Sequence, residues 1–322
     1  MISGLIRNSR LLTCALITSM SFSLAGCSQK KDIHQTLRSN FAATPAQLPQ
    51  VIAAYQPWFG KHSHMNVGYS SQDRVVLERQ IEQAKGLGIS AFVVNWYGPG
   101  KDFEDRSYAL LQQLASQHNF FTALMYDEPE DIARSTEDTI RDLDYAYRHY
   151  IGPEAPSRSA YLQYDGRPLI FIFPKGGRTD WSKVRAAVNS WNRPPLLLYK
   201  DVNAREAPNF DGFYAWVHPG NRGWARDGSQ WGEQYLDSFY REMTSKYANK
   251  LAVGAAWPGF DDSHASWGRN RHIDARCGKT FEESLRFFRR YYNDSHPLPF
   301  LMIVTWNDYE EGTAIEKGLQ RC

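Results

Sequence analysis

Eight short apolar runs recur along this 322-residue chain, and longer amphipathic segments separate them. Most of the runs hold four to eight residues, as expected for parallel strands that are buried on both faces. Strands that alternate with helices predict an α/β protein, and eight such strands predict a single (β/α)8 barrel of the TIM type. The predicted strands are Val51–Tyr55, Ile89–Trp96, Phe121–Tyr126, Pro168–Phe173, Leu196–Tyr199, Gly212–Trp216, Leu251–Trp257 and Phe300–Trp306.

Helix signals lie between these runs. The segments carry apolar residues at helical spacing, and the first of them ends at Gly86. Thr136 is followed by acidic residues, which suits the amino terminus of a helix. Thr280 and Glu283 have the spacing of a capping box. The predicted helices are Asp73–Gly86, Ser107–His118, Thr136–Tyr150, Trp231–Lys246 and Thr280–Tyr292.

The chain ends at Cys322, soon after the last predicted strand. A closing eighth helix would have almost no residues, so either the barrel closes without it or the chain is a truncated product. Residues 50–322 are expected to form one barrel domain, because a segment of this length can bury a core of that size.

Residues 1–26 have the features of a targeting segment. Arg7 and Arg10 precede the apolar stretch Leu11–Phe22, which is too short to span a bilayer comfortably. Residues 24–27, with the sequence LAGC, resemble a bacterial lipobox, in which cleavage leaves Cys27 as the lipid-bearing first residue. An ordinary signal peptide and an uncleaved anchor are the alternatives.

A lipid on Cys27 would hold the protein on a membrane leaflet without a membrane span. By resemblance to lipoprotein sorting rules, Ser28 fits retention at the outer membrane. Residues 27–49 are largely polar and are expected to form a tether. Cys277 and Cys322 remain in the exported part, and an oxidising compartment would allow them to pair.

Charge and composition narrow the class of function. The net charge is +2, from 37 basic and 35 acidic residues, and no basic run follows the leader, so nothing indicates a nucleic-acid partner. Aromatic residues make up 14% of the chain, and 10 of them are Trp. Sugars stack their apolar faces on aromatic rings, so this content suits a carbohydrate enzyme, although core packing accounts for part of it.

Aromatic and acidic residues follow several of the predicted strands. The active site of such a barrel lies at the carboxyl ends of its strands, so these residues should converge in space. Their recurrence predicts a binding site there. Along the chain these residues are Tyr55, Trp58, Trp96, Tyr126, Glu128, Trp216, His218, Trp257, Asp261, Asp262, Trp306, Asn307 and Tyr309.

The last loop supplies the carboxyl groups that glycoside cleavage needs, an acid and a second carboxylate. In a turn that leaves the strand, Asp308 and Glu311 can both face the mouth of the barrel, and Glu310 then points elsewhere. Gly312 permits such a turn. Glu316 lies beyond it and is expected to be a helix cap or a surface charge.

Residues 305–316, TWNDYEEGTAIE, resemble the terminal motif of glycoside hydrolase family 99, the endo-α-mannosidases and endo-α-mannanases. They also resemble the W-N-D-Y-G-E loop of family 71, the α-1,3-glucanases. Further landmarks of family 99 are matched near the first, second, third and seventh strands, at residues 55–59, 96–98, 126–128 and 258–262. The resemblance spans about Val51 to Glu316.

Family 99 enzymes are metal-independent and retain anomeric configuration through a 1,2-anhydro sugar. The resemblance therefore implies that Asp308 deprotonates the sugar 2-hydroxyl, that Glu311 is the general acid/base, and that no cofactor takes part. Asp308 stands where family 99 has Glu, and its shorter side chain changes the gap to a sugar by about 1 Å. Family 71 carries Asp at this position and is regarded as inverting, so the stereochemistry stays open.

The other strand-end residues are expected to bind substrate, with Tyr55, Glu128 and His218 at hydroxyl groups. The stacking candidates are Trp58, Trp96, Trp216 and Trp257. Arg269 and Arg271 either contact substrate or brace Asp261 and Asp262, and bracing is favoured because buried carboxylates need partners. His62 and His64 are not expected to bind a metal, since no third ligand is placed.

Three functions follow from these patterns. The first is a monomeric glycoside hydrolase, displayed on the cell surface, that acts on an α-linked polysaccharide or glycan, with a mannan-like one favoured. The second is a carbohydrate-binding lipoprotein that has lost catalysis, which the departure at Asp308 and the abrupt carboxyl terminus favour. The third is an exported barrel enzyme of another class, such as a lyase.

Overall fold

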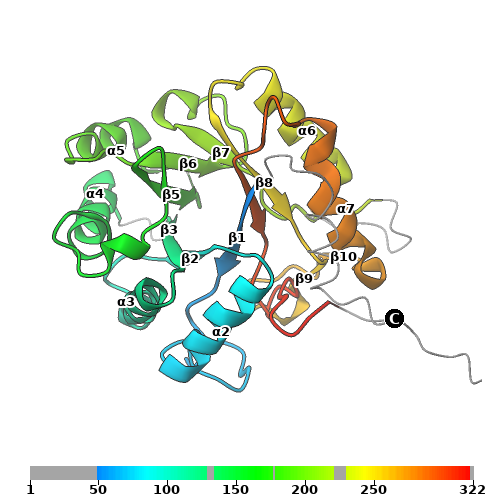
Figure 1. Cartoon of the computed structure of the whole chain (residues 1–322), viewed down its shortest axis with the longest axis horizontal. Coiled ribbons are helices and arrows are strands. Elements are labelled where there is room, and N and C mark those ends of the chain that lie inside the picture. The colour runs from blue at the N-terminus through cyan, green and yellow to red at the C-terminus, as the bar shows by residue number, and fades with distance from the viewer. Residues whose placement is uncertain (1–48, 129–133, 177, 221–229, 320–322) are drawn as a thin grey trace, which may run out of the picture. The chain divides into compact units, whose positions relative to one another are not determined.

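The computed structural model describes residues 49–128, 134–176, 178–220 and 230–319. Within these ranges, eight parallel strands close into a barrel and the helices lie outside it (Figure 1). This confirms the predicted (β/α)8 fold. The targeting segment, Cys27 and all of the tether except Pro49 lie outside the described residues.

Each predicted strand corresponds to one strand of the barrel, and their ends differ by at most three residues. The ring closes because β11 pairs with β1, with Phe300 beside Gln50, and because β3 pairs with β5, with Leu124 beside Ile170. The short strand β4 (Gln163–Tyr164) adds an antiparallel edge to β5. The barrel strands are β1 (Gln50–Tyr55), β2 (Ala91–Trp96), β3 (Phe121–Asp127), β5 (Arg167–Phe173), β6 (Leu196–Lys200), β7 (Gly212–Tyr214), β8 (Leu251–Ala256) and β11 (Phe300–Ile303).

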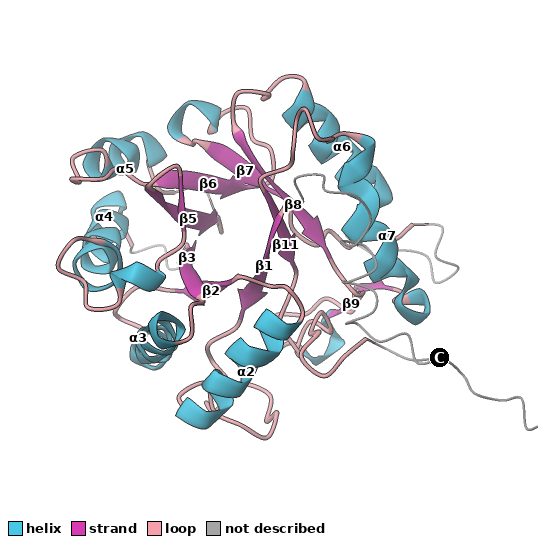
Figure 2. Ribbon diagram, viewed as in Figure 1, coloured by secondary structure: helices cyan, strands magenta, loops and turns pink. Residues whose placement is uncertain are grey.

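Helices surround the strands (Figure 2). Five correspond to predicted ones, and the eight-residue α5 (Trp181–Val188), which begins after the capping residue Asp180, was not predicted. Between β6 and β7 the described chain forms only a 3-10 turn, Ala207–Asn209. The described residues after β11, as far as Leu319, form turns and no helix. The five others are α2 (Arg74–Gly86), α3 (Asp102–Gln117), α4 (Thr136–Ala146), α6 (Glu233–Thr244) and α7 (Lys279–Phe287).

Two capping predictions are corrected. Helix α4 is capped by Ser135, which exchanges hydrogen bonds with Asp138 in a capping box, and not by Thr136. The amino-terminal cap of α7 is Gly278, so Thr280 lies inside the helix and does not form the predicted capping box. Its hydroxyl instead donates to the backbone carbonyl of Asp274 at 2.6 Å.

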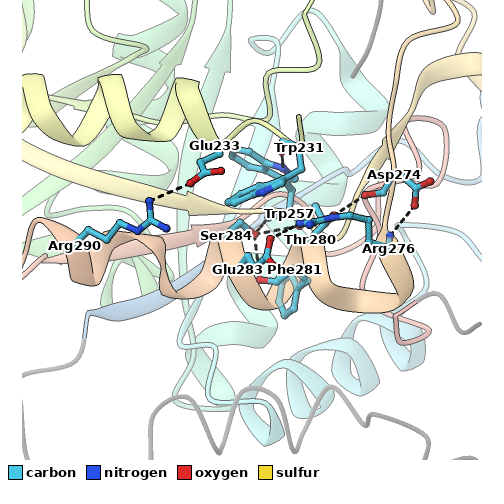
Figure 3. A network of polar contacts seen from close by, with 10 residues as sticks. All are labelled: Trp231, Glu233, Trp257, Asp274, Arg276, Thr280, Phe281, Glu283, Ser284 and Arg290. Atoms are coloured by element: carbon cyan, nitrogen blue, oxygen red, sulfur yellow. Dashed lines mark hydrogen bonds and ion pairs between the residues drawn. The ribbon is translucent and has the colours of Figure 1, made fainter. Parts of the chain in front are cut away.

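Figure 3 shows the polar contacts that hold α6 and α7 beside β8. The indole N–H of Trp257 donates to the carbonyl of Trp231 at 3.0 Å, and the backbone N–H of Trp257 donates to the Ser284 hydroxyl at 3.2 Å. Arg290 pairs with Glu233 at 3.1 Å. The aromatic residue at the end of β8 is thus part of the outer wall of the barrel.

Cys277, in the 3-10 turn just before α7, is disulfide-bonded, and the other three cysteines of the chain lie outside the described residues. None of the helices in the described ranges is long and apolar enough to cross a membrane.

Candidate active site

The loop after β11 places two of its three carboxylates in one cleft. Its tight turn is closed by the Thr313 N–H, which donates to the Asp308 carbonyl at 3.0 Å. Gly312 has a φ of +63°, and a Cβ there would lie 3.1 Å from the Asp261 nitrogen. Asp308 and Glu311 both line the cleft, whereas Glu310 points toward the loop after β1. This is the arrangement that the sequence predicted for the turn.

The cleft has a volume of about 270 Å³ and lies at the carboxyl ends of the strands. It shares five lining residues with a neighbouring groove of about 550 Å³, which extends over the loops after β2 and β3. The two hollows are therefore continuous. The residues that line the cleft are Gln56, Trp58, His64, Asn95, Tyr97, Asp127, Phe173, Lys175, Trp216, Trp267, Asp308 and Glu311.

Asp308 is buried and accepts three hydrogen bonds. Its Oδ1 accepts the backbone N–H groups of Glu310 at 3.1 Å and Glu311 at 2.9 Å, and its Oδ2 accepts the Gln56 amide at 3.1 Å. Burial raises the pKa of Asp308 well above its ordinary value, and the neighbouring Glu311 carboxylate raises it further. The backbone donors act in the opposite direction because they favour the ionised form.

Glu311 is the second carboxyl group of the cleft. Burial raises its pKa, while a hydrogen bond of 2.9 Å from the Trp267 indole to Oε1 lowers it. The positive charges of Arg271 and Lys175 also favour the ionised form. Because Asp308 and Glu311 share one cleft, ionising either carboxyl makes it harder to ionise the other, and the two titrate as a pair.

Aromatic rings form one wall of the cleft. Trp58 stacks on His64 at 4.9 Å, and Trp267 meets the edge of Trp58 at 6.0 Å. His64 is held by Glu310, whose Oε2 lies 3.0 Å from Nδ1 of the imidazole. Glu310 therefore supports this wall. Trp216 is the second predicted stacking residue that lines the cleft, and it packs on Phe173.

Five predicted substrate-binding residues are fully buried and do not line the cleft. Tyr55 donates to Gln80 of α2, and Trp96 donates to Asp105 of α3, each at 2.8 Å. These side chains point away from the barrel axis and lie under the helices. We therefore assign them a structural role and not a role in substrate binding. The five are Tyr55, Trp96, Tyr126, Trp257 and Trp306.

The residues of the last loop also differ from the prediction. Asn307 is buried, and its amide exchanges two hydrogen bonds with the backbone of Gln56, so it joins the ends of β1 and β11. Tyr309 donates to Glu316 at 2.8 Å and does not line the cleft. Glu316 is neither a cap nor a surface charge, because Tyr69, Tyr309 and Gln80 all donate to its buried carboxylate.

The four other predicted residues do not line the cleft itself. Glu128 lines the outer groove, and its carboxylate accepts the backbone N–H groups of Lys175 and Thr179. His218 is exposed at the end of β7 and stacks on Tyr235 at 5.0 Å. Asp261 is exposed. Asp262 is fully buried against Arg271, as the bracing hypothesis predicts.

Sequence reasoning missed several residues that do line the cleft. Asn95 and Asp127 are joined at 3.5 Å between β2 and β3, and Lys175 pairs with Asp127 at 3.4 Å. Asn95 is adjacent to Trp96, and Asp127 is adjacent to Tyr126, so the strand ends carry a signal but the sequence assigns it to the wrong face. The missed residues are Gln56, His64, Asn95, Tyr97, Asp127, Phe173, Lys175 and Trp267.

Another cavity, of about 520 Å³, lies at the opposite end of the barrel. Two carboxylates line it: Asp165 is exposed, and Asp211 is paired with Arg167 and Arg185. Among the described residues, no group of three or more His, Cys, Asp or Glu side chains is placed to hold a metal ion.

Residues 62–317 match the model of glycosyl hydrolase family 71. The chain belongs to this family. The motifs taken alone favour family 99, but the Asp at position 308 is the residue expected for family 71. The family 71 match covers the cleft-lining residues from His64 to Glu311.

The chain is also similar to mannosidases. The chain is 21% identical to mouse glycoprotein endo-α-1,2-mannosidase over 79% of this chain and 56% of the relative. It is 23% identical to a mouse glycoprotein endo-α-1,2-mannosidase-like protein over 85% of this chain and 63% of the relative. The chain thus spans less than two thirds of the length of these curated relatives.

Solved structures share the fold. The family 99 endo-α-mannosidase of Bacteroides thetaiotaomicron, in complex with bis-tris propane, superposes with a TM-score of 0.65 at 21% identity. That match covers 83% of this chain and 86% of the other. A protein described as glycoside hydrolase-like superposes with a TM-score of 0.57 at 14% identity, over 87% of this chain and 91% of the other.

Proposed function

We propose that this family 71 member is a glycoside hydrolase that cleaves an α-linked polysaccharide or glycan. The observation that carries the proposal is the pair of carboxyl groups, the buried Asp308 and the half-buried Glu311, in a single cleft at the carboxyl ends of the barrel strands. Hydrolysis of a glycosidic bond needs one protonated acid and one carboxylate. A carboxyl pair that shares a proton supplies both.

The hydrogen-bond donors around each carboxyl group indicate which one is the acid and which one is the base. Asp308 accepts three N–H groups, which stabilise its ionised form, whereas Glu311 accepts one from Trp267. Burial raises the pKa of Asp308 well above its ordinary value and acts against this order, so the assignment rests on the hydrogen-bond donors: we propose that Glu311 protonates the leaving oxygen. Asp308 is the base, which acts either on the sugar 2-hydroxyl or on a water molecule.

Unpaired polar atoms in the cleft favour a hydroxyl-rich ligand. Gln56 Oε1, Trp58 Nε1 and Asn95 Oδ1 are buried and have no hydrogen-bond partner among the described residues, and all three residues line the cleft. A buried polar atom without a partner costs about 1–3 kcal/mol, so these atoms favour a ligand that can satisfy them. Sugar hydroxyls both donate and accept.

The continuous groove and the relatives suggest a chain-like substrate. A cleft that opens into a groove of about 550 Å³ has room for several sugar units on one side of the carboxyl pair. The names of the mouse relatives favour an α-mannan, while Asp308 and the family 71 match favour an α-1,3-glucan. We propose α-mannan first and α-glucan as the alternative.

The test is reducing-sugar release from α-1,2- and α-1,6-linked mannans and α-1,3- and α-1,4-glucans, using the soluble protein from Ser28 onward. Cleavage of one polymer class identifies the substrate, and the anomeric form of the first product, read by NMR, separates retention from inversion. Binding without cleavage would favour the inactive carbohydrate-binding protein. An unsaturated product that absorbs in the ultraviolet would indicate a lyase.

We also propose that the chain is an exported lipoprotein anchored through Cys27. Expression of the full chain in a bacterium with metabolic labelling by a fatty acid should label the protein and place it in the membrane fraction. Cys27→Ser should lose the label entirely, because no thiol remains at the lipobox to receive the lipid. The matched variant Cys14→Ser, within the leader, should keep the label. Label that persists in Cys27→Ser would contradict the proposal.

A further inference from the structure

Trp267 lies in the long loop between β8 and α7, at the edge of the cleft. Although 43% of its surface is exposed, its Nε1 donates a hydrogen bond of 2.9 Å to Oε1 of Glu311. Its ring also meets the edges of Trp58 and His64, at 6.0 and 6.2 Å. The indole therefore joins the aromatic wall of the cleft to one of its two carboxyl groups.

The loop that carries Trp267 is wound around a buried carboxylate. Asp262 is fully buried and accepts the backbone N–H of Arg269 at 3.1 Å, the backbone N–H of Arg271 at 2.7 Å and the Arg271 Nε at 2.8 Å. A Cβ on Gly268 would lie 1.7 Å from the Asp262 carbonyl oxygen, so only glycine fits this close approach. These contacts set the position of the residues on either side of Gly268, Trp267 among them.

The same loop also holds the main chain of Glu311. The Asp261 N–H donates to the Glu311 carbonyl at 2.8 Å. One loop thus contacts Glu311 at two places, its backbone and one oxygen of its side chain. The described residues make no hydrogen bond to the other carboxylate oxygen, Oε2, of Glu311.

We propose that Trp267 is a positioning residue for Glu311: its N–H holds Oε1 and leaves Oε2 directed to the glycosidic oxygen of the substrate. The role of Glu311 as the acid rests on the proposed function. The position of the Glu311 side chain and the strength of its hydrogen bond with Trp267 do not depend on the proposed function. Both can be measured without a substrate.

Trp267→Phe tests this contact because it keeps an aromatic ring and removes the N–H. Loss of the donor destabilises the Glu311 carboxylate and raises its pKa. The alkaline limb of kcat/KM, which reports loss of the acid's proton, should therefore move up by about one pH unit. We also expect kcat to fall about tenfold with a smaller change in KM, because a less well-placed acid slows the reaction.

Trp191→Phe is the matched control. It removes a similar indole bond, to Asp144 at 3.1 Å, far from the cleft on the β5–β6 side of the barrel, and should leave both readouts unchanged. Carbon-13 NMR titration of the Glu311 carboxyl measures the same shift without a substrate. An unchanged Glu311 titration in Trp267→Phe would overturn the proposal, whereas a shifted titration in a chain that cleaves no polymer would contradict only the proposed function.

Gly268→Ala tests whether the conformation of the loop affects Glu311 through Trp267. The added Cβ must displace the loop from the Asp262 carbonyl, and it changes no charge. The variant should shift the Glu311 titration upward, and the double variant with Trp267→Phe should shift it no further than Trp267→Phe alone. Additive shifts would show that Gly268 acts on Glu311 by another route, and that outcome would overturn this part of the proposal.

Discussion

Glu311→Gln is expected to lower kcat/KM at least about a hundredfold on the polymer that the wild-type protein cleaves. The amide preserves the shape of the side chain and can still accept the Trp267 hydrogen bond, but it carries no proton for the leaving oxygen. The measurement is reducing-sugar release from that polymer. Glu154→Gln is the control, because Glu154 is exposed in the loop between α4 and β4, at the opposite end of the barrel.

Activated aryl glycosides separate an acid role from a structural one. Their leaving groups depart without a proton, so Glu311→Gln should lose much less activity on them than on a polysaccharide. Equal losses on both substrates would contradict the acid role of Glu311.

The same substitution should also stabilise the fold, in a pH-dependent way. The pKa of Glu311 is raised in the folded state, so ionising it there costs free energy that the unfolded chain does not pay. Below the ordinary pKa of Glu, the side chain is protonated in both the folded and the unfolded chain, so this cost vanishes. Glu311→Gln should therefore raise the unfolding free energy near pH 7 and change it much less at about pH 4. Denaturant unfolding at both pH values measures the difference.

Asp308→Asn is expected to lower kcat/KM by about a hundred- to ten-thousandfold, because an amide cannot accept the proton that a base must take. In contrast to Glu311→Gln, activated aryl glycosides should not restore activity, since removal of a proton from the nucleophile is needed whatever the leaving group. A strong recovery on activated substrates would show that Asp308 is not the base. The two substitutions together therefore assign the two roles.

The fold should tolerate this change. The new amide oxygen can still accept the two backbone N–H groups of the turn. Its NH₂ would face the amide nitrogen of Gln56, but the Gln56 Oε1 is buried without a partner among the described residues, so a rotation of the Gln56 amide turns an acceptor toward it. Asp165→Asn is the control, because Asp165 lies exposed in the β4–β5 turn with a φ of +49°, which Asn also tolerates. Loss of the folded state in Asp308→Asn, seen by circular dichroism, would contradict this account.

Strand positions could be predicted closely because parallel barrel strands are buried on both faces and therefore form continuous apolar runs. The run Phe121–Tyr126, for example, differs from β3 by a single residue. The loop that carries Asp308 and Glu311 could also be predicted, because its turn is local: Gly312 with a positive φ brings the two side chains to one side within a few residues.

The face on which each strand-end residue lies could not be predicted. Side chains alternate along a strand, but a run that is apolar on both faces gives no mark of which face lines the barrel. The strand-end pattern therefore predicts Trp96 as a binding residue, although it lies under α3, and does not predict Asn95 and Tyr97, which line the cleft. Tyr126 and Asp127 repeat the same error on β3.

Contacts between segments that lie far apart along the chain could not be predicted from the sequence either. Glu316 looked like a surface charge until the fold brought Tyr69 and Gln80, more than 200 residues earlier, to its carboxylate. Trp267 meets Glu311 only because the loop after β8 winds around Asp262 and reaches across to the loop after β11. The sequence by itself determined the barrel and its acid loop, since both depend on local patterns of burial and turn geometry. Only the tertiary structure decided which side chains surround that loop, because closure of the ring is what sets the inward face of each strand and brings separate loops together.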